Sequence, residues 1–218
     1  MIKLVNLCLK FTKEYYALCN INLSIEKGER ICLLGESESG KTSLLRTIAG
    51  LENEYTGEAF INGQEIKSVD FKQDVNLAYL PRQSVFFDNK TLAYNVEYAI
   101  KLRDKTSSPY EIEQKVDDVL TSFDLIQKKD SKVKELSDFE KYLLALARTT
   151  VRKVDILLVD NIFDYLNEEE GNLLLSKIKE LYYNENDICI FSSEEESKVL
   201  KFEARVVKLN NGVIVGEE

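Results

Sequence analysis

No histidine occurs among the 218 residues, and there are only two prolines, one methionine and four cysteines. The cysteines lie apart in apolar segments with no CxxC pair, at Cys8, Cys19, Cys32 and Cys189. Without histidine or paired cysteines, the usual zinc-site spacings are missing. The sequence therefore predicts buried, reduced thiols, which suits a protein of a reducing cytosol.

Long apolar runs and an excess of basic residues are also missing. No apolar stretch approaches the roughly 18 residues of a membrane helix. Met1 is followed by the strand-like segment IKLVNLCLKF rather than by a signal peptide. The 29 Lys and Arg against 38 Asp and Glu give a net charge of −9, which argues against a nucleic-acid partner. We therefore expect a soluble, cytoplasmic chain that meets a membrane only peripherally.

Short runs of Ile, Leu and Val alternate with helical segments along the chain. RICLLG, VNLAYLP, DILLVD and DICIFSS have the composition of strands buried on both faces, which predicts an α/β core with a parallel or mixed sheet. The first 30 residues and GEAFING, with its Asn62-Gly63 turn, predict a separate antiparallel β layer. The tail ARVVKLNNGVIVGEE, which turns at Asn211-Gly212, is interpreted as part of the same layer.

After Gln83, strand signals give way to helix signals. Ser108, Pro109 and Glu111 have the spacing of a helix start: a hydroxyl N-cap, a proline in the first turn and a glutamate three residues after the cap. The two EEE triplets, 168–170 and 194–196, are interpreted as solvated helix starts. We predict one domain over residues 1–218, with an α/β core (1–82 and 154–218) and an inserted helical subdomain (about 83–153).

The segment RICLLGESESGKTSLLRTIAG carries the strongest chemical signal, because it has the strand, glycine-rich loop and helix of a phosphate-binding loop. The loop residues are Gly35, Glu36, Ser37, Glu38, Ser39, Gly40, Lys41, Thr42 and Ser43. Backbone N–H groups and the helix N-terminus are expected to face nucleotide phosphates, with Lys41 on the terminal phosphates and Thr42 on Mg²⁺. Because Glu36 and Glu38 would repel a polyanion, we expect them to point outward.

With this loop placed, the whole chain resembles the nucleotide-binding subunits of ATP-binding cassette (ABC) transporters, which are P-loop NTPases. IKLVNLCLKF resembles the family's first strand, YTGEAFING the strand pair after the first helix, and LNNGVIVGEE the C-terminal hairpin. The resemblance implies an aromatic residue on adenine: Phe11 by position, or Tyr15 or Tyr16, because the following segment is one residue longer than usual. It also implies that Asp160, at the end of DILLVD, holds the magnesium shell.

YLPRQSVFFDNKTLAYNV resembles the family's loop whose glutamine touches the metal and couples to the membrane subunits. The matching residue is Gln83, or Arg82 when the count starts from a different anchor. Thr91 and Asn95 fall at familiar spacing. The resemblance thus adds Gln83 to the metal and catalytic candidates.

Four positions depart from the family pattern. The signature, usually Leu-Ser-Gly-Gly-Gln, is LSDFE, which keeps Ser137 as a nucleotide contact or as the cap of a capping box with Glu140. The catalytic glutamate is replaced by Asn161, the next loop's aspartate by Asn167, and the switch histidine by Ser193. An amide at Asn161 can hold water but cannot take its proton at neutral pH. A carboxylate from elsewhere, for instance Asp164 or a partner's residue, could replace it.

The resemblance therefore implies an Mg²⁺- and ATP-binding subunit of an ABC-type membrane transporter, with weak or absent hydrolysis of its own. Its partners would be membrane-spanning subunits and a second nucleotide-binding subunit, identical or different, and its place the inner face of the cell membrane. Two alternatives stay open: a soluble regulator or scaffold that binds ATP without turnover, and a P-loop kinase for a small molecule. The kinase is disfavoured because no lid-like arginine cluster is evident.

Overall fold

The computed structural model describes residues 1–10, 12, 15–71, 73–102 and 104–218. Phe11, the first candidate for adenine stacking, lies outside the described residues. The chain divides into two compact units, which comprise residues 1–82, 155–167 and 178–218 in the first and residues 83–154 and 168–177 in the second. In the described segments, no helix has the length and apolar character needed to cross a bilayer.

The N-terminal part of the first unit forms the predicted antiparallel layer, a four-stranded sheet of order β2-β1-β4-β5. Its strands are β1 (Ile2–Lys10), β2 (Tyr16–Ile25), β4 (Tyr55–Ile61) and β5 (Gln64–Glu65). Buried and exposed residues largely alternate along β1 and β2. This pattern is typical of a sheet with one face on a core and the other in solvent.

A six-stranded sheet of order β10-β9-β3-β8-β7-β6 forms the α/β core. Its strands are β3 (Arg30–Leu34), β6 (Leu77–Leu80), β7 (Ile156–Val159), β8 (Ile188–Ser193), β9 (Arg205–Asn210) and β10 (Val213–Glu217). All neighbours are parallel except β9 and β10. Every residue of β7 and β8 is buried, as expected for central strands covered on both faces.

The C-terminal hairpin corrects one prediction. The tail forms a hairpin as expected, but it belongs to the six-stranded sheet, because β9 pairs in parallel with β3 and β10 pairs with β9. Its assignment to the antiparallel layer is therefore wrong. The Asn211-Gly212 turn determines only that two adjacent strands pair, and both turn residues have positive φ. The sheet edge that the hairpin joins depends on distant residues that a local pattern does not contain.

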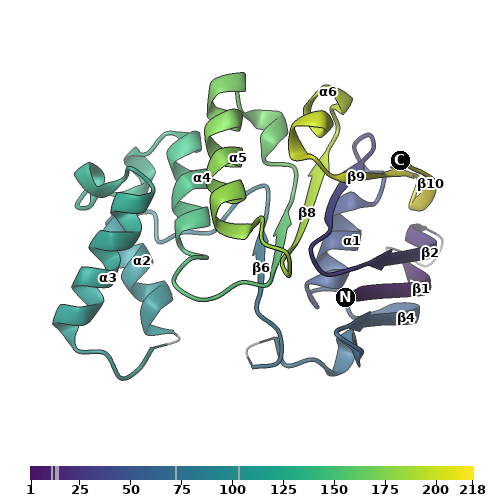
Figure 1. The fold of residues 1–218 in the computed structure, drawn as a ribbon, viewed down its shortest axis with the longest axis horizontal. Helices are drawn as coiled ribbons and strands as arrows, with labels where there is room; N and C mark the ends of the chain where they lie inside the picture. Colours follow the sequence, from purple (N-terminus) through teal and green to yellow (C-terminus); the bar gives the residue numbers. More distant parts are fainter. Residues whose placement is uncertain (11, 13–14, 72, 103) are drawn as a thin grey trace. The chain divides into compact units, whose positions relative to one another are not determined.

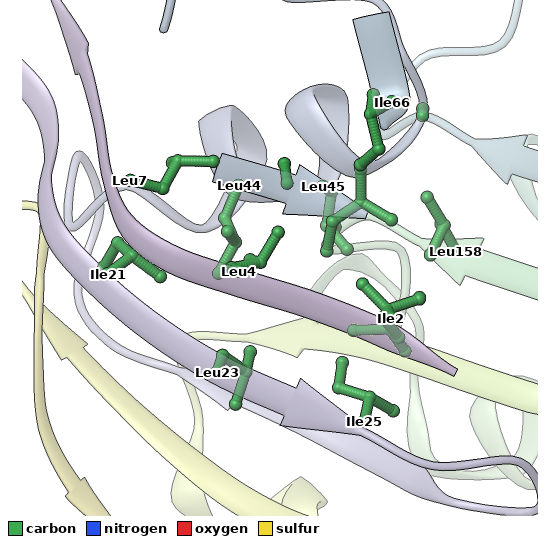
Figure 2. Close-up of a cluster of buried hydrophobic side chains, with 14 of the residues drawn as sticks. Ile2, Leu4, Leu7, Ile21, Leu23, Ile25, Leu44, Leu45, Ile66 and Leu158 are labelled. Atoms are coloured by element: carbon green, nitrogen blue, oxygen red, sulfur yellow. The ribbon is translucent and has the colours of Figure 1, made fainter. Parts of the chain in front are cut away.

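One hydrophobic cluster connects both sheets with α1 (Lys41–Ile48). Figure 2 shows side chains of β1, β2 and α1 pointing toward one another in this cluster. Leu44, Leu45 and Ile48 of α1 are fully buried in it. Because these three residues anchor α1, they also fix the loop that leads from β3 into the helix.

The first unit also contains short helical segments, which are η1 (Ile66–Ser68), η4 (Phe163–Tyr165), α6 (Glu196–Val199) and η5 (Leu200–Phe202). The second unit contains α2 (Leu92–Lys101), α3 (Pro109–Ser122), η2 (Ile126–Lys128), η3 (Val133–Glu135) and α4 (Asp138–Ala147). Of α5 (Glu168–Tyr182), residues 168–177 group with the second unit. Figure 1 shows α2 and α3 side by side, and α3 begins with the predicted capping box of Ser108 and Glu111.

The four cysteines are free thiols, but only two are buried. Burial raises the pKa of the Cys32 and Cys189 thiols to about 12, as the prediction of inert, reduced thiols requires. Cys8 and Cys19 are half-buried on neighbouring strands, with their Sγ atoms 4.0 Å apart. The prediction of buried thiols is therefore wrong for this pair, which lies where the register between β1 and β2 is irregular.

Candidate functional site

The loop between β3 and α1 closes tightly against the sheet, and two glycines make this possible. A Cβ on Gly35 would lie 2.3 Å from the backbone oxygen of Leu209, and one on Gly40 would lie 2.8 Å from that of Ala17. Gly40 also has a φ of 104°, which residues with a side chain rarely adopt. Any side chain at either position would push the loop away from the sheet.

The first turn of α1 borders a cavity of about 530 Å³, a size typical of small-molecule sites. Loop residues 37–43 line it, together with Tyr15, Arg82, Asn161 and Glu194. No side chain of the described residues caps α1. Its first N–H groups, which have no partner within the helix, are therefore available to an anion in this cavity.

Lys41 is almost fully buried at the floor of the loop, with an exposed fraction of 5%. Its Nζ donates to the backbone oxygens of Gly35, at 2.7 Å, and Glu36, at 2.8 Å, and to Ser39 Oγ, at 3.2 Å. Burial lowers the pKa of the ammonium, while the negative charge of Glu194 gives the largest opposing effect. The ammonium of Lys41 is thus held by oxygen acceptors of the loop, and phosphate oxygens of a ligand can replace these acceptors.

Thr42 is joined to Asp160 across the sheet. Its Oγ1 donates a 3.0 Å hydrogen bond to Asp160 Oδ1, which also accepts from Ser192 Oγ at 2.9 Å. The phenol of Tyr79 donates to Asp160 Oδ2 at 2.8 Å, and burial together with this carboxylate holds the pKa of Tyr79 well above its usual value. These three donors compensate the burial of Asp160, which is only 2% exposed.

The Thr42 hydroxyl and the Asp160 carboxylate are hard oxygen donors, the ligand type that Mg²⁺ prefers. Among the described residues, no group of three or more His, Cys, Asp or Glu could hold a metal by itself. The pair therefore fits Mg²⁺ only in the mode that this ion usually adopts, in which phosphate oxygens and water complete the coordination.

Asn161 follows Asp160 directly, has a φ of 52° and lines the cavity. Its N–H donates to Ser192 Oγ at 2.8 Å, and its Nδ2 donates to Glu194 Oε1 at 3.2 Å. Its Oδ1 is buried and accepts no hydrogen bond from the residues that the structure describes. The opposite orientation of the amide would place two oxygens against each other, so the contact with Glu194 determines which way Asn161 faces.

Glu194 is the site residue that sequence reasoning missed. The triplet 194–196 is exposed and leads into α6 as predicted, but Glu194 also lines the cavity. One sequence feature could have identified Glu194: it directly follows the buried strand DICIFSS. In a parallel sheet, functional residues commonly follow the carboxyl ends of the strands.

Ser193, in contrast, does not line the cavity. It is fully buried, and its Oγ donates to Asp164 Oδ1 at 2.6 Å. The other oxygen of Asp164 accepts the N–H of Glu194 at 2.7 Å. Asp164 is thus engaged in positioning the turn after β8, and its carboxylate is not part of the cavity lining.

Of the aromatic candidates for adenine, Tyr15 lines the cavity and Tyr16 does not. The ring of Tyr16 instead lies 5.2 Å from the Nζ of Lys10. Glu36 is exposed outside the lining, whereas Glu38 is exposed but contributes to it. The expectation that both carboxylates avoid the cavity is therefore met only at Glu36.

The candidates near residue 83 fall in different units. Arg82 belongs to the first unit, lines the cavity and lies over the ring of Tyr165 at 4.1 Å. Gln83 begins the second unit and is exposed in the connection between β6 and α2. In that unit Thr91 caps α2, and the buried side chain of Asn95 bonds both the N–H and the C=O of Phe87.

Ser137 lies at the N-terminus of α4, in the second unit. Its Oγ accepts the N–H of Glu140 at 3.2 Å, and the Glu140 carboxylate accepts the N–H of Ser137 at 3.0 Å. This is the capping box that the sequence offered as a structural role for the segment. Asp138 is 88% exposed and pairs with Lys141 at 3.1 Å.

The chain is similar to known proteins over most of its length. The family described as ABC transporter matches residues 18–164, which is more than half of the chain. The sulfate/thiosulfate import ATP-binding protein CysA of Pectobacterium atrosepticum is 31% identical over 203 residues, covering 92% of this chain and 61% of that protein. The spermidine/putrescine import ATP-binding protein PotA of Legionella pneumophila is 33% identical over 198 residues, covering 90% and 53%.

Solved structures agree in fold over the whole chain. The ATP-binding cassette MJ0796, in a dimeric post-hydrolysis state bound to ADP and Pi, matches with a TM-score of 0.87 and 25% identity, covering 100% of this chain and 98% of that one. A second dimeric structure of MJ0796, described as a bacterial ABC transporter cassette, gives a TM-score of 0.88. The chain spans between 53% and 65% of the length of the curated relatives that it matches.

Proposed function

The chain is an ATP-binding domain of the ABC transporter family, and from this we propose its function. We propose that it is the Mg²⁺- and ATP-binding subunit of a membrane transporter. The observation that carries the proposal is the cavity in which Lys41, Thr42 and the uncapped first turn of α1 meet. A polyanion there would gain a buried cation, free backbone N–H groups and a site for its metal.

ATP would lie with its phosphates on residues 37–43 and its base toward Tyr15. Tyr15 lies at the rim of the same cavity as the loop, and its ring is large enough to cover adenine. Mg²⁺ would be held by the Thr42 hydroxyl, with Asp160 ordering the shell around it. Arg82 adds a positive charge to this wall of the cavity, where a polyphosphate needs one.

Hydrolysis by the isolated chain is expected to be slow. The amide of Asn161 stands where the family has a carboxylate, and an amide cannot accept a proton from water at neutral pH. Losing a positioned base typically lowers the rate by about 10²- to 10⁴-fold. Binding of ATP depends on other residues, so it should persist when turnover is weak.

The second unit offers a surface for the membrane-spanning partner. Four exposed residues form what we call the aromatic face. Two of them precede α2 and two lie in it: Val85, Phe87, Tyr94 and Tyr98. Phe87 contacts the rings of Tyr94 and Tyr98 edge-on, with centroids 5.4 and 4.8 Å apart. Exposed aromatic clusters of this kind are typical of protein interfaces, and an apolar helix of a membrane subunit fits this one.

Two experiments test the proposal. ATP binding by the purified chain should require Lys41, and a chain that binds no ATP would refute it. For the partner, Val85→Asp should abolish co-purification of a multi-span protein from detergent-solubilised membranes. Tyr110→Asp should not, because Tyr110 is also exposed but lies outside the aromatic face. A chain that stays unassociated with any membrane protein in its own cells would instead favour a regulator.

A further inference from the structure

Glu194 is an exposed carboxylate that contributes to the cavity lining. It lines the cavity together with Lys41 and Thr42, the residues proposed to hold the terminal phosphates and the metal. Its negative charge is the largest influence opposing the effect of burial, which lowers the pKa of Lys41. A negative charge beside the phosphates weakens nucleotide binding. A carboxylate in this cavity is therefore expected to have a chemical role that offsets this cost.

Glu194 is also held in place at two points. Its N–H donates to Asp164 Oδ2 at 2.7 Å, and Asn161 Nδ2 donates to its Oε1 at 3.2 Å. Its second carboxylate oxygen has no hydrogen-bond partner among the described residues, and the residue is exposed, so water can reach this oxygen. A carboxylate that is oriented through one oxygen and open at the other has the arrangement of a general base.

Asn161 and Glu194 form a complementary pair. A carboxylate at position 161 would face the Glu194 carboxylate at hydrogen-bond distance, and the two like charges would repel each other. An amide removes this repulsion and supplies a donor. The amide of Asn161 and the acid of Glu194 are therefore parts of one arrangement.

We propose that Glu194 is the catalytic base of this chain and that Asn161 positions it. This inference rests on the proposed function, since it assigns the residue that carries out the remaining hydrolysis. In the step, the water oxygen forms a bond to the γ-phosphorus while the bond to the β,γ-bridging oxygen breaks. The water proton passes to the Glu194 carboxylate, and the products are ADP and inorganic phosphate.

The test is single-turnover hydrolysis by the full chain in excess over labelled ATP with Mg²⁺, with bound nucleotide and released phosphate measured on the same samples. Glu194→Gln should slow phosphate release by about 10²- to 10⁴-fold. It should leave ATP affinity unchanged or raise it, because a negative charge near the phosphates is removed. A residue with a merely structural role would not separate rate from affinity in this direction.

Glu195→Gln is the matched control. It makes the same chemical change one residue further on, where the side chain is exposed, pairs with Lys198 at 3.2 Å and does not line the cavity. Both its affinity and its rate should equal those of the wild type.

A swap of the two side chains makes the test sharper. Asn161→Glu alone should gain no rate and should bind ATP more weakly, because it places two carboxylates side by side. Asn161→Glu combined with Glu194→Gln exchanges acid and amide and should recover most of the wild-type rate. A double variant that is no faster than Glu194→Gln would refute the shared role of the two positions.

The outcomes separate the two proposals. If wild type and Glu194→Gln bind ATP equally and release phosphate equally fast, or if the wild type binds ATP and releases no phosphate, Glu194 is not the base and the binding function stands. If the wild type binds no ATP, both proposals fail.

Discussion

Thr42 Oγ1 and Asp160 Oδ1 lie 3.0 Å apart although 118 residues separate them in the chain. The contact joins the start of α1 to the residue that follows β7, across the intervening strand β8. Ser192 of β8 completes the link, because its Oγ donates to the same Asp160 oxygen and accepts the N–H of Asn161. The start of α1, the end of β8 and the residues after β7 are thus bound together, so the site is built by the sheet and not by a single loop.

Lys41→Ala should abolish most nucleotide binding while the fold persists. The ammonium is the buried cation of the phosphate loop, and charge-assisted hydrogen bonds contribute about 1.5–3 kcal/mol each, which predicts at least a 10- to 150-fold loss of ATP affinity. Calorimetric titration with ATP measures the loss, and the melting temperature measures the fold. Lys27→Ala removes an exposed charge outside the cavity and should bind ATP normally. Unchanged affinity in Lys41→Ala would contradict the assignment of the loop.

Thr42→Val should remove the contribution of magnesium to ATP binding. Valine keeps the shape of threonine but has no oxygen for the metal, while Asp160 retains its bonds from Ser192 and Tyr79. The measurement compares ATP affinity with Mg²⁺ and with a chelator, in wild type and variant. The gain due to Mg²⁺ should shrink toward zero in the variant, and an undiminished gain would place the metal elsewhere.

The core and the phosphate loop could be predicted from the sequence because their signals are local. A buried apolar run followed by Gly35 to Thr42 specifies strand, loop and helix within one segment, and the structure forms them there. The same is true of the Ser108 and Ser137 capping boxes, whose partners lie three residues away. Such patterns contain every residue that makes the contact.

The features that could not be predicted from the sequence are contacts between residues far apart in the chain. The contact between Asn161 and Glu194 spans 33 positions, and nothing in the local composition of either segment marks it. The edge that β9 joins is equally non-local, since its partner β3 lies near the other end of the chain. Neither contact can be predicted from one segment alone. Both depend on the order of β7, β8, β3 and β9 in the sheet.

Tyr15→Ala should weaken the binding of ATP but not that of inorganic polyphosphate. Stacking of a base on an aromatic ring contributes about 1–3 kcal/mol, and polyphosphate has no base to stack. Competition against a fluorescent nucleotide measures both ligands in the same assay. Tyr16→Ala is the matched control, because its ring lies outside the cavity lining, and it should change neither affinity. Equal losses for both ligands in Tyr15→Ala would exclude a role in recognising the base.

Ser137→Ala should destabilise the isolated chain. Ser137 Oγ accepts the N–H of Glu140 at the start of α4, and loss of an N-cap acceptor typically lowers the free energy of unfolding by about 1 kcal/mol. Urea denaturation measures this loss, and Ser137→Asp should recover most of it, because aspartate also accepts at an N-cap. A serine that acted only on the nucleotide of another subunit would leave the stability of the single chain unchanged. The size of the alanine effect, and its rescue by aspartate, therefore decide whether LSDFE serves the fold of its own chain.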